Sequence, residues 1–128
     1  MKTIRLDYSK QCADEPDKGH NRWHPAIPPA AEVDLDEIIE METRDALDGQ
    51  ITRASVSEDI RKVDLNLIHP LTGPIYVRGA RPGDWLEVSI HEIVPANWGF
   101  TTIIPGFGFL RDEFLEPPVR LRQRGIFF

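Results

Sequence analysis

Short runs of alternating apolar and polar residues recur along the chain. In the clearest of them, Leu86, Val88 and Ile90 alternate with other residues, which predicts a strand with three apolar side chains on one face. Three further runs have the composition of short strands. They lie at residues 3–6, 38–43 and 75–77. The run at 38–43 also contains Glu and Met, which favour helices, so a helical turn remains an alternative there.

Residues typical of turns separate these runs. The Gly73-Pro74 pair predicts one turn, and the sequence RPGD at 81–84 predicts another, with proline at its second position and glycine at its third. Asp48 and Gly49 predict a turn over residues 46–49 and form a hairpin signal. The chain is therefore expected to change direction often between short strands.

One short helix is predicted over residues 55–64. Ser55 lies three residues before Glu58, a spacing typical of a capping box. Eleven prolines and nine glycines fall between the short apolar runs elsewhere. These patterns together predict a mainly β protein with many turns and one short helix.

Composition and charge narrow the class of protein. A chain of 128 residues with 41% hydrophobic and 28% charged residues is expected to form one globular domain over residues 1–128. The net charge of −6 argues against nucleic acid or an anionic membrane as a partner. No apolar run approaches the length of a membrane span, and no signal peptide is recognisable at the N-terminus.

Cys12 is the single cysteine and cannot form an internal disulfide. A reducing compartment is therefore expected, and we predict a soluble cytoplasmic protein. The polar sequence around Cys12 predicts an ordinary exposed thiol. At the other end, residues 115–128 contain the basic and apolar sequence VRLRQRGIFF. This divergent basic tail is either a terminal strand with a basic face or a point at which the domain or reading frame has been cut.

His20 and His24 have the spacing of zinc-protease histidines on a helix. The glutamate of that motif is replaced by Asn21, and Pro25 would end the helix, so we exclude a metalloprotease. A metal-binding role in an extended segment remains open because neutral imidazole is a common ligand. The alternative is a pair of loop histidines with local hydrogen bonds.

Two acidic residues and two histidines elsewhere are candidates for site chemistry. Asp45 follows a predicted strand, where a carboxylate could bind a hard metal ion or transfer a proton, or else cap its own turn. His69 could act as a base oriented by Asp64, or serve as a structural loop residue. Asp48 is expected to be a turn residue, and His91 is expected to lie on the surface.

The sequence PGFGF at 105–109 is rich in glycine and aromatic residues. It lacks the lysine and hydroxyl residue of a phosphate-binding loop, which makes nucleotide binding improbable. Gly106, Phe107 and Gly108 suit a loop that passes close under a small substrate pocket, with a tightly packed structural loop as the alternative. No serine nucleophile motif is present, so any hydrolysis would use a metal-bound or carboxylate-activated water.

Several of these segments together resemble the acetamidase/formamidase family, whose members hydrolyse the C–N bond of short linear amides. The resemblance runs from His20 to about Phe114. It rests on HNRWHP at 20–25, the Asp45 segment with the following GQI, HPLTGPIYVRGARPGD at 69–84 and PGFGFLRDEF at 105–114.

The resemblance implies a mainly β, sandwich-like fold and hydrolysis of formamide or acetamide to ammonia and the carboxylic acid. It also implies homo-oligomers and a bound divalent metal, for which zinc and calcium are the expected ions. Asp45 carries over as a site carboxylate and metal ligand, and His20 carries over as a metal ligand. His69 stands where acetamidase-like members often have asparagine, and it is kept as a candidate catalytic residue.

Members of that family are much longer than this chain, and their second half carries further site residues. We therefore expect a chain that corresponds to the N-terminal half of an amidase and has an incomplete site alone. The alternative is a non-catalytic β domain or subunit that oligomerises, or that completes a split amidase with a missing C-terminal partner chain.

Overall fold

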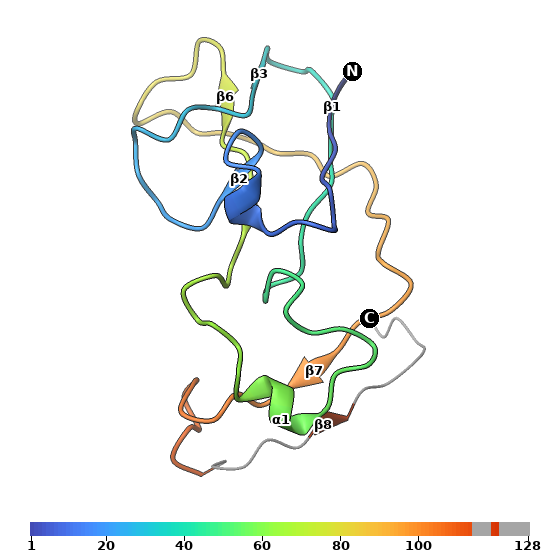
Figure 1. Cartoon of the computed structure of the whole chain (residues 1–128). Helices are drawn as coiled ribbons and strands as arrows, with labels where there is room; N and C mark the ends of the chain where they lie inside the picture. The colour runs from blue at the N-terminus through green and yellow to red at the C-terminus, as the bar shows by residue number, and fades with distance from the viewer. Residues whose placement is uncertain (114–118, 121–128) are drawn as a thin grey trace. The chain divides into compact units, whose positions relative to one another are not determined.

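The computed structural model describes residues 1–113 and 119–120, and the chain divides into two compact units. The first unit comprises Met1–Gln50 and Asp64–Glu87, and the second comprises Ile51–Val63 and Val88–Phe128. Figure 1 shows the course of the chain through its short elements. The expected single domain over residues 1–128 stays a prediction. Most of the basic tail at 115–128 lies outside the described residues.

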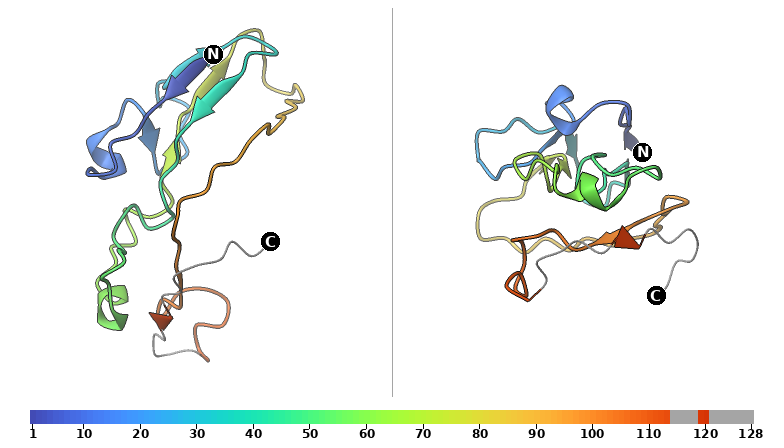
Figure 2. Two further views of the ribbon diagram at one scale, coloured as in Figure 1. Left: turned by 90° about the vertical axis from the view of Figure 1, so that its right-hand side faces the viewer. Right: turned by 60° about the horizontal axis from the view of Figure 1, so that its bottom comes forward.

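The first unit is built from three two-stranded ladders. Two are parallel and one is antiparallel. The pairs are β1 (Lys2–Ile4) with β4 (Ile39–Met41), β3 (Ala31–Val33) with β6 (Ile75–Val77), and β2 (Gly19–His20) with β5 (Leu71–Thr72). The left view of Figure 2 shows short arrows of this unit side by side. A single 3-10 turn, η1 (Cys12–Asp14), precedes β2.

Side chains from several of these elements form the core of the first unit. Successive side chains of a strand point to opposite faces, so β1 and β3 each bury their last apolar residue. The buried apolar residues of this unit are Ile4, Cys12, Val33, Leu47 and Ile68. This small core holds the loops that carry the candidate site residues.

The second unit contains the helix and one ladder. The helix α1 (Ser57–Ile60) lies within the predicted range, and its first turn is closed by the Val56 N–H, which donates to Asp59 Oδ2 at 2.9 Å. The predicted Ser55–Glu58 capping pair is therefore displaced by one residue, because Ser55 Oγ instead accepts the Thr52 N–H. The ladder pairs β7 (Thr101–Thr102) with β8 (Val119–Arg120), and the helix buries Ile60.

Three of the predicted strands are confirmed, as β1, β4 and β6. The strand expected around Leu86, Val88 and Ile90 is wrong, since no strand forms there and these side chains are 58%, 73% and 74% exposed. A strand buries an apolar face only when it pairs within a packed sheet, and this segment has no strand partner among the described residues. His91 is exposed, as expected.

The predicted turns at 81–84 and 46–49 are confirmed, whereas the predicted hairpin is wrong. In the RPGD sequence the Asp84 N–H donates to the Arg81 carbonyl at 3.0 Å, and Gly83 takes a φ of +98°, as a turn with glycine third requires. Residues 46–49 also form a turn. The hairpin signal at Asp48 is wrong, because β4 before it pairs in parallel with β1 and no strand follows directly.

The described residues are thus mostly non-helical, with small ladders and one four-residue helix. This agrees with a mainly β protein. Among the described residues, no helix has the length and apolar character needed to cross a bilayer.

Candidate functional site

A pocket with a volume of about 390 Å³ lies in the first unit beside η1 and β2. Backbone and side-chain groups from five stretches of chain line it. These are residues 12, 13 and 16, residues 19–22, residues 27 and 28, residue 48, and residues 66 and 67. The pocket therefore gathers His20 and Asp48, two of the polar residues that the sequence draws attention to, with apolar side chains around them.

His20 is half-buried in the pocket wall and has a defined tautomer. Its Nδ1 lies 2.7 Å from the Arg22 carbonyl oxygen, which can only accept, so Nδ1–H is the donor. A neutral ring with hydrogen on Nδ1 keeps its lone pair on Nε2, ready to take a proton or bind a metal ion. The indole of Trp23 meets the ring edge-on, with centroids 6.3 Å apart.

His24 has the opposite arrangement. Its Nδ1 accepts the Ala26 N–H at 3.1 Å, so the hydrogen of the neutral ring lies on Nε2. The ring is exposed and does not line the pocket. Both histidines therefore form the local hydrogen bonds of the alternative interpretation, and of the two only His20 lines the pocket.

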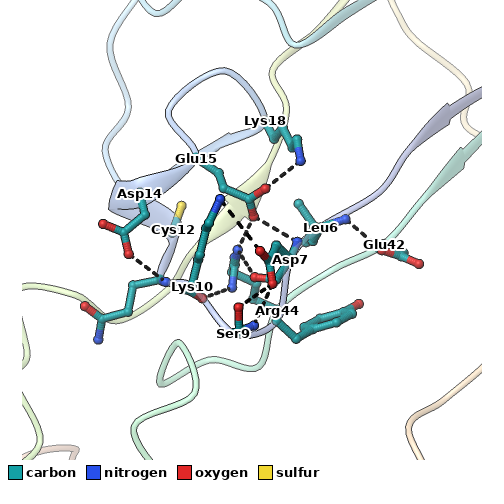
Figure 3. A network of polar contacts seen from close by, with 12 residues as sticks. Leu6, Asp7, Ser9, Lys10, Cys12, Asp14, Glu15, Lys18, Glu42 and Arg44 are labelled. Atoms are coloured by element: carbon teal, nitrogen blue, oxygen red, sulfur yellow. Dashed lines mark hydrogen bonds and ion pairs between the residues drawn. The ribbon is translucent and has the colours of Figure 1, made fainter.

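A buried ionic network surrounds Glu15 and Arg44, and Figure 3 shows it from close by. The Arg44 guanidinium bonds to the Glu15 carboxylate, and its Nε lies 3.7 Å from Asp48 Oδ1. Lys18 bonds to the other Glu15 oxygen. The Lys18 hydrogen bond, supported by the Asp7 N–H and the Arg44 charge, holds the pKa of Glu15 below its usual range. The network joins residues 7–18 to the turn that follows β4.

Cys12 is buried, so the prediction of an exposed thiol is wrong. The local polar sequence did not reveal a contact with Asp48, which is 36 positions away. Asp48 Oδ2 accepts the Cys12 N–H at 2.8 Å, and Cys12 is buried. Burial, reinforced by the negative charge of Asp48, raises the pKa of the thiol. Asp48 lies in a turn as predicted, with a φ of +54°, yet it is only 3% exposed and Oδ1 has no hydrogen-bond donor.

Asp45 and His69 lie on two loops that are bonded together. The Asp45 carboxylate accepts the N–H groups of Leu47 at 2.9 Å and Gly49 at 2.7 Å, which is the turn-capping role of the alternative interpretation. The His69 N–H donates to the Ala46 carbonyl at 2.8 Å, so the histidine follows the same turn. Both residues are exposed.

Asp64 does not take the orienting role considered for it. Its Oδ1 accepts two hydrogen bonds from Asn66, one from the backbone and one from the side-chain amide. This carboxylate therefore shapes the loop at the pocket edge, because Asn66 lines the pocket and its carbonyl accepts hydrogen bonds from Asn21 and Arg22.

The described residues do not assemble a complete metal site. Within the part of the chain that the structure describes, no three His, Cys, Asp or Glu side chains are grouped so that they could hold an ion. Asp45 already uses both oxygens to cap its turn, and His20 lines the pocket. These two donors alone are too few for a divalent metal site.

The glycine-rich loop belongs to the second unit and is built for a tight turn. The Phe107 N–H donates to the Ile104 carbonyl at 3.0 Å, and Gly106 and Gly108 take φ values of +77° and +93°. Only glycine adopts such angles without strain, which explains both positions. The role of Gly106, Phe107 and Gly108 in a substrate pocket stays a prediction.

Sequence patterns gave no sign of Arg44 and Glu15 as partners or of Leu67 as a pocket residue. Arg44 and Glu15 are 29 positions apart, and no periodicity or motif links them. A buried arginine needs a carboxylate partner, and Arg44 follows directly after the predicted strand 38–43. That position could have suggested an ion pair but not its partner.

The sequence of the chain matches known proteins over most of its length. Residues 5–123 match the sequence model of the Acetamidase/Formamidase family, a wider range than the motifs at 20–114. The chain is 41% identical over 122 residues to an acetamidase of Mycolicibacterium smegmatis and 40% identical over 123 residues to a formamidase of Methylophilus methylotrophus. These matches cover 85% and 91% of the chain but only 30% of each relative.

The fold has a solved counterpart. A gamma lactamase from Delftia acidovorans superposes with a TM-score of 0.74 at 35% identity, over 91% of this chain and 30% of that protein. The chain thus corresponds, in sequence and in fold, to under a third of the length of the proteins it matches.

Proposed function

Since this chain belongs to the acetamidase/formamidase family, we propose that it supplies part of the active site of an amide hydrolase. The reaction is cleavage of the C–N bond of a linear amide such as formamide or acetamide, with release of ammonia and the carboxylic acid. The observation that carries the proposal is the match over residues 5–123, at about 40% identity to an acetamidase and a formamidase. The remaining residues of the site come from outside this segment, because the chain spans about 30% of those relatives.

His20, Asp45 and His69 are the residues that we propose for the chemistry. His20 lines the pocket and keeps its lone pair on Nε2, which suits the ring as a metal ligand. Asp45 is held in one orientation by two N–H donors, which suits a carboxylate that orients water or imidazole. His69 lies on the adjoining loop, and Gly106, Phe107 and Gly108 are the proposed loop of the substrate pocket.

Metal assistance by zinc or calcium is also proposed. Asp45 and His20 would each offer one ligand, and further ligands would have to come from outside this segment. When bound, such an ion would polarise the amide carbonyl. A sandwich-like β fold, a cytoplasmic location and homo-oligomers complete the proposal.

The test supplies the rest of the active site from a full-length relative, so that the contribution of this segment can be measured. Residues 5–123 are grafted into the Mycolicibacterium smegmatis acetamidase in place of its matching segment, and ammonia release from formamide and acetamide is measured with zinc or calcium. The chimera should be active, and His20→Ala or Asp45→Ala in it should lower kcat/KM by about 100-fold or more. Leu35→Ala, at an exposed leucine, is the matched control. Full activity in both site variants would contradict these assignments.

A second candidate function is that of a non-catalytic subunit, and one observation favours it. Trp85, Ile90 and Val94 belong to one exposed stretch and are 100%, 74% and 82% exposed. An apolar stretch of this kind is typical of an association surface, so the chain would self-associate or complete a partner chain. Light scattering tests this, since Ile90→Lys with Val94→Lys should lower the associated fraction. A monomeric wild-type chain would contradict it.

A further inference from the structure

Arg44 is the buried residue that directly precedes Asp45, and no step of the proposed reaction uses it. Its side chain is 6% exposed. A guanidinium keeps its charge in proteins and has five N–H donors, so burying it requires several acceptors around it. The structure supplies these acceptors from segments far from residue 44 in sequence, which makes Arg44 a cross-link between segments.

Three acceptors on the N-terminal part of the chain surround the Arg44 guanidinium (Figure 3). It donates to the carbonyl of Lys10, to the carbonyl of Asp7 at 3.2 Å, and to Glu15 Oε2. Glu15 is itself buried, and the same oxygen also accepts the Asp7 N–H at 3.0 Å. Because the guanidinium is planar and its donors point in fixed directions, these bonds together define the orientation of the arginine.

Glu15 connects this cross-link to His20. Its backbone carbonyl accepts the N–H groups of Lys18 at 3.0 Å and of Gly19 at 3.2 Å. Gly19 is the first residue of β2 and directly precedes His20. The side chain of Glu15 thus bonds to Arg44 while its backbone anchors the start of the strand that carries the histidine.

Asp48 makes a second connection between the same two segments. It lies in the turn that Asp45 caps, and its N–H donates to the Asp45 carbonyl at 3.0 Å. Asp48 Oδ2 accepts the Cys12 N–H at 2.8 Å, and Oδ1 lies 3.7 Å from Arg44 Nε. The turn is therefore tied to the N-terminal segment at its start by Arg44 and towards its end by Asp48.

From these contacts, we propose that Arg44 is a positioning residue that fixes the Asp45 carboxylate relative to His20 in the amide hydrolase site. The inference rests on the proposed hydrolase function. Stability alone is a poor explanation for the network, because a buried ion pair is often no more stabilising than apolar side chains of similar volume. A defined geometry is the better explanation, since a misplacement of about 1 Å at a site can lower turnover by about 100-fold.

Exchange of one amide proton in the 128-residue chain tests the positioning without requiring turnover. The Gly49 N–H donates to Asp45 Oδ2 at 2.7 Å, so its exchange with water, measured by magnetisation transfer in nitrogen-15 spectra, reports how firmly the carboxylate is held. Arg44→Lys keeps the charge but cannot meet all the acceptors at once, and it should raise this exchange rate by about tenfold or more. Unchanged exchange at Gly49 would overturn the proposal.

A matched substitution controls for the loss of an arginine. Arg78 is exposed and also has two carboxylate partners, so Arg78→Lys should leave the exchange of Gly49 at its wild-type rate. Resonances of β3 and β6 that keep their positions show that the Arg44 variant is folded. Equal acceleration in both variants would contradict a specific role for Arg44.

The chimera of the proposed function measures the effect on turnover. Arg44→Lys should lower kcat by about tenfold and Arg44→Met by about 100-fold, with KM changed by less than about threefold, because the site groups are misplaced while the contacts that bind the substrate remain. A merely structural role would lower the melting temperature and leave the kcat of the folded enzyme unchanged. Glu15→Gln alters the other side of the pair and should lower kcat in the same direction, which keeps the test available if an arginine variant does not fold.

The two measurements distinguish this inference from the proposed function. An active chimera whose folded Arg44 and Glu15 variants keep full kcat would overturn the positioning role while the hydrolase function stands. A chimera that is inactive with the wild-type segment, together with faster Gly49 exchange in Arg44→Lys, would overturn the hydrolase function while the positioning of Asp45 by Arg44 stands.

Discussion

Gly19 occupies a position in β2 where the backbone of a neighbouring strand leaves no room for a side chain. A Cβ atom there would lie 2.9 Å from the Leu71 carbonyl oxygen and 3.1 Å from Cys12 Sγ. The first of these atoms belongs to the paired strand β5 and cannot move without disturbing the ladder. A single methyl group would therefore push β2, and His20 with it, away from its partner.

We predict that Gly19→Ala lowers the free energy of unfolding by about 1–3 kcal/mol, the usual cost of overpacking a close contact. Urea unfolding followed by circular dichroism measures the change. Gly99→Ala is the matched control, because no atom lies within 4 Å of its added Cβ. Equal effects of the two substitutions would show that the close approach at Gly19 is not maintained in solution.

Cys12 should make the free energy of unfolding fall at alkaline pH. Burial, reinforced by Asp48, raises the pKa of its thiol above the ordinary value of about 9. The folded state thus holds the thiol proton more tightly than the unfolded state does. The resulting stabilisation is complete below pH 9 and is lost as the pH rises through the raised pKa.

The wild-type chain should accordingly lose stability relative to Cys12→Ala as the pH is raised from 8 to 10, as measured by thermal unfolding at each pH. At pH 8 the native thiol should react with a maleimide at least tenfold more slowly than in urea, because only the exposed thiolate reacts. A stability difference that stays constant with pH, together with fast native labelling, would contradict this.

At the scale of elements, the β1–β4 ladder is three residues long and depends on one carboxylate at its end. Glu42 accepts the Leu6 N–H at 2.7 Å and an Arg5 N–H at 3.0 Å, and its own N–H donates to the Ile4 carbonyl. The Leu6 N–H, followed by Arg5, holds the pKa of Glu42 below its usual range. The carboxylate thus extends the pairing beyond Met41.

Glu42→Gln should lower the melting temperature by a few degrees at pH 7. The lowered pKa places the stabilisation at neutral pH and removes it as the pH falls from about 4.5 through the lowered value. The difference between variant and wild type should therefore shrink at pH 3. Glu40→Gln is the control, since Glu40 bonds only to Arg5 in an exposed pair and should change little. Equal shifts in the two variants at pH 7 would contradict the argument.

The elements also show how far sequence alone could predict the fold. Ladder strands β1, β4 and β6 contain isoleucine or valine in extended runs, and they were predictable from composition and alternation. Strands β2 and β5 have two residues each, too few to carry any periodicity. The segment from Leu86 to Ile90 has the clearest alternation and no strand, because pairing depends on a partner that the local pattern does not specify.

Some residues of the candidate site could also be predicted from the sequence, and others could not. His20 and Asp45 were recognisable because their motifs are local in sequence. Asp48 was recognisable only as a turn residue, and its contact with Cys12 depends on chain segments 36 positions apart. Pocket residues such as Leu67 became visible only when the folded loops placed them together.

At the scale of the whole molecule, the two units have unequal cores. Among the described residues, the first unit buries five apolar side chains, whereas the second buries Ile51 and Ile60. Buried apolar area is the main source of stability, so local opening should require less free energy in the second unit. Hydrogen exchange followed by mass spectrometry should therefore show the backbone of α1 exchanging at least tenfold faster than that of β1 and β4.

Substitution in the cores tests the same asymmetry. Ile60→Ala removes one of the two buried apolar side chains described for the second unit and should leave α1 without measurable protection. Ile68→Ala removes a comparable side chain from the larger core of the first unit, and β1 and β4 should remain protected although less strongly. If α1 and β1 exchange at one common rate in the wild type and change together in both variants, then the chain opens as one cooperative body and the inequality of the cores does not govern its stability.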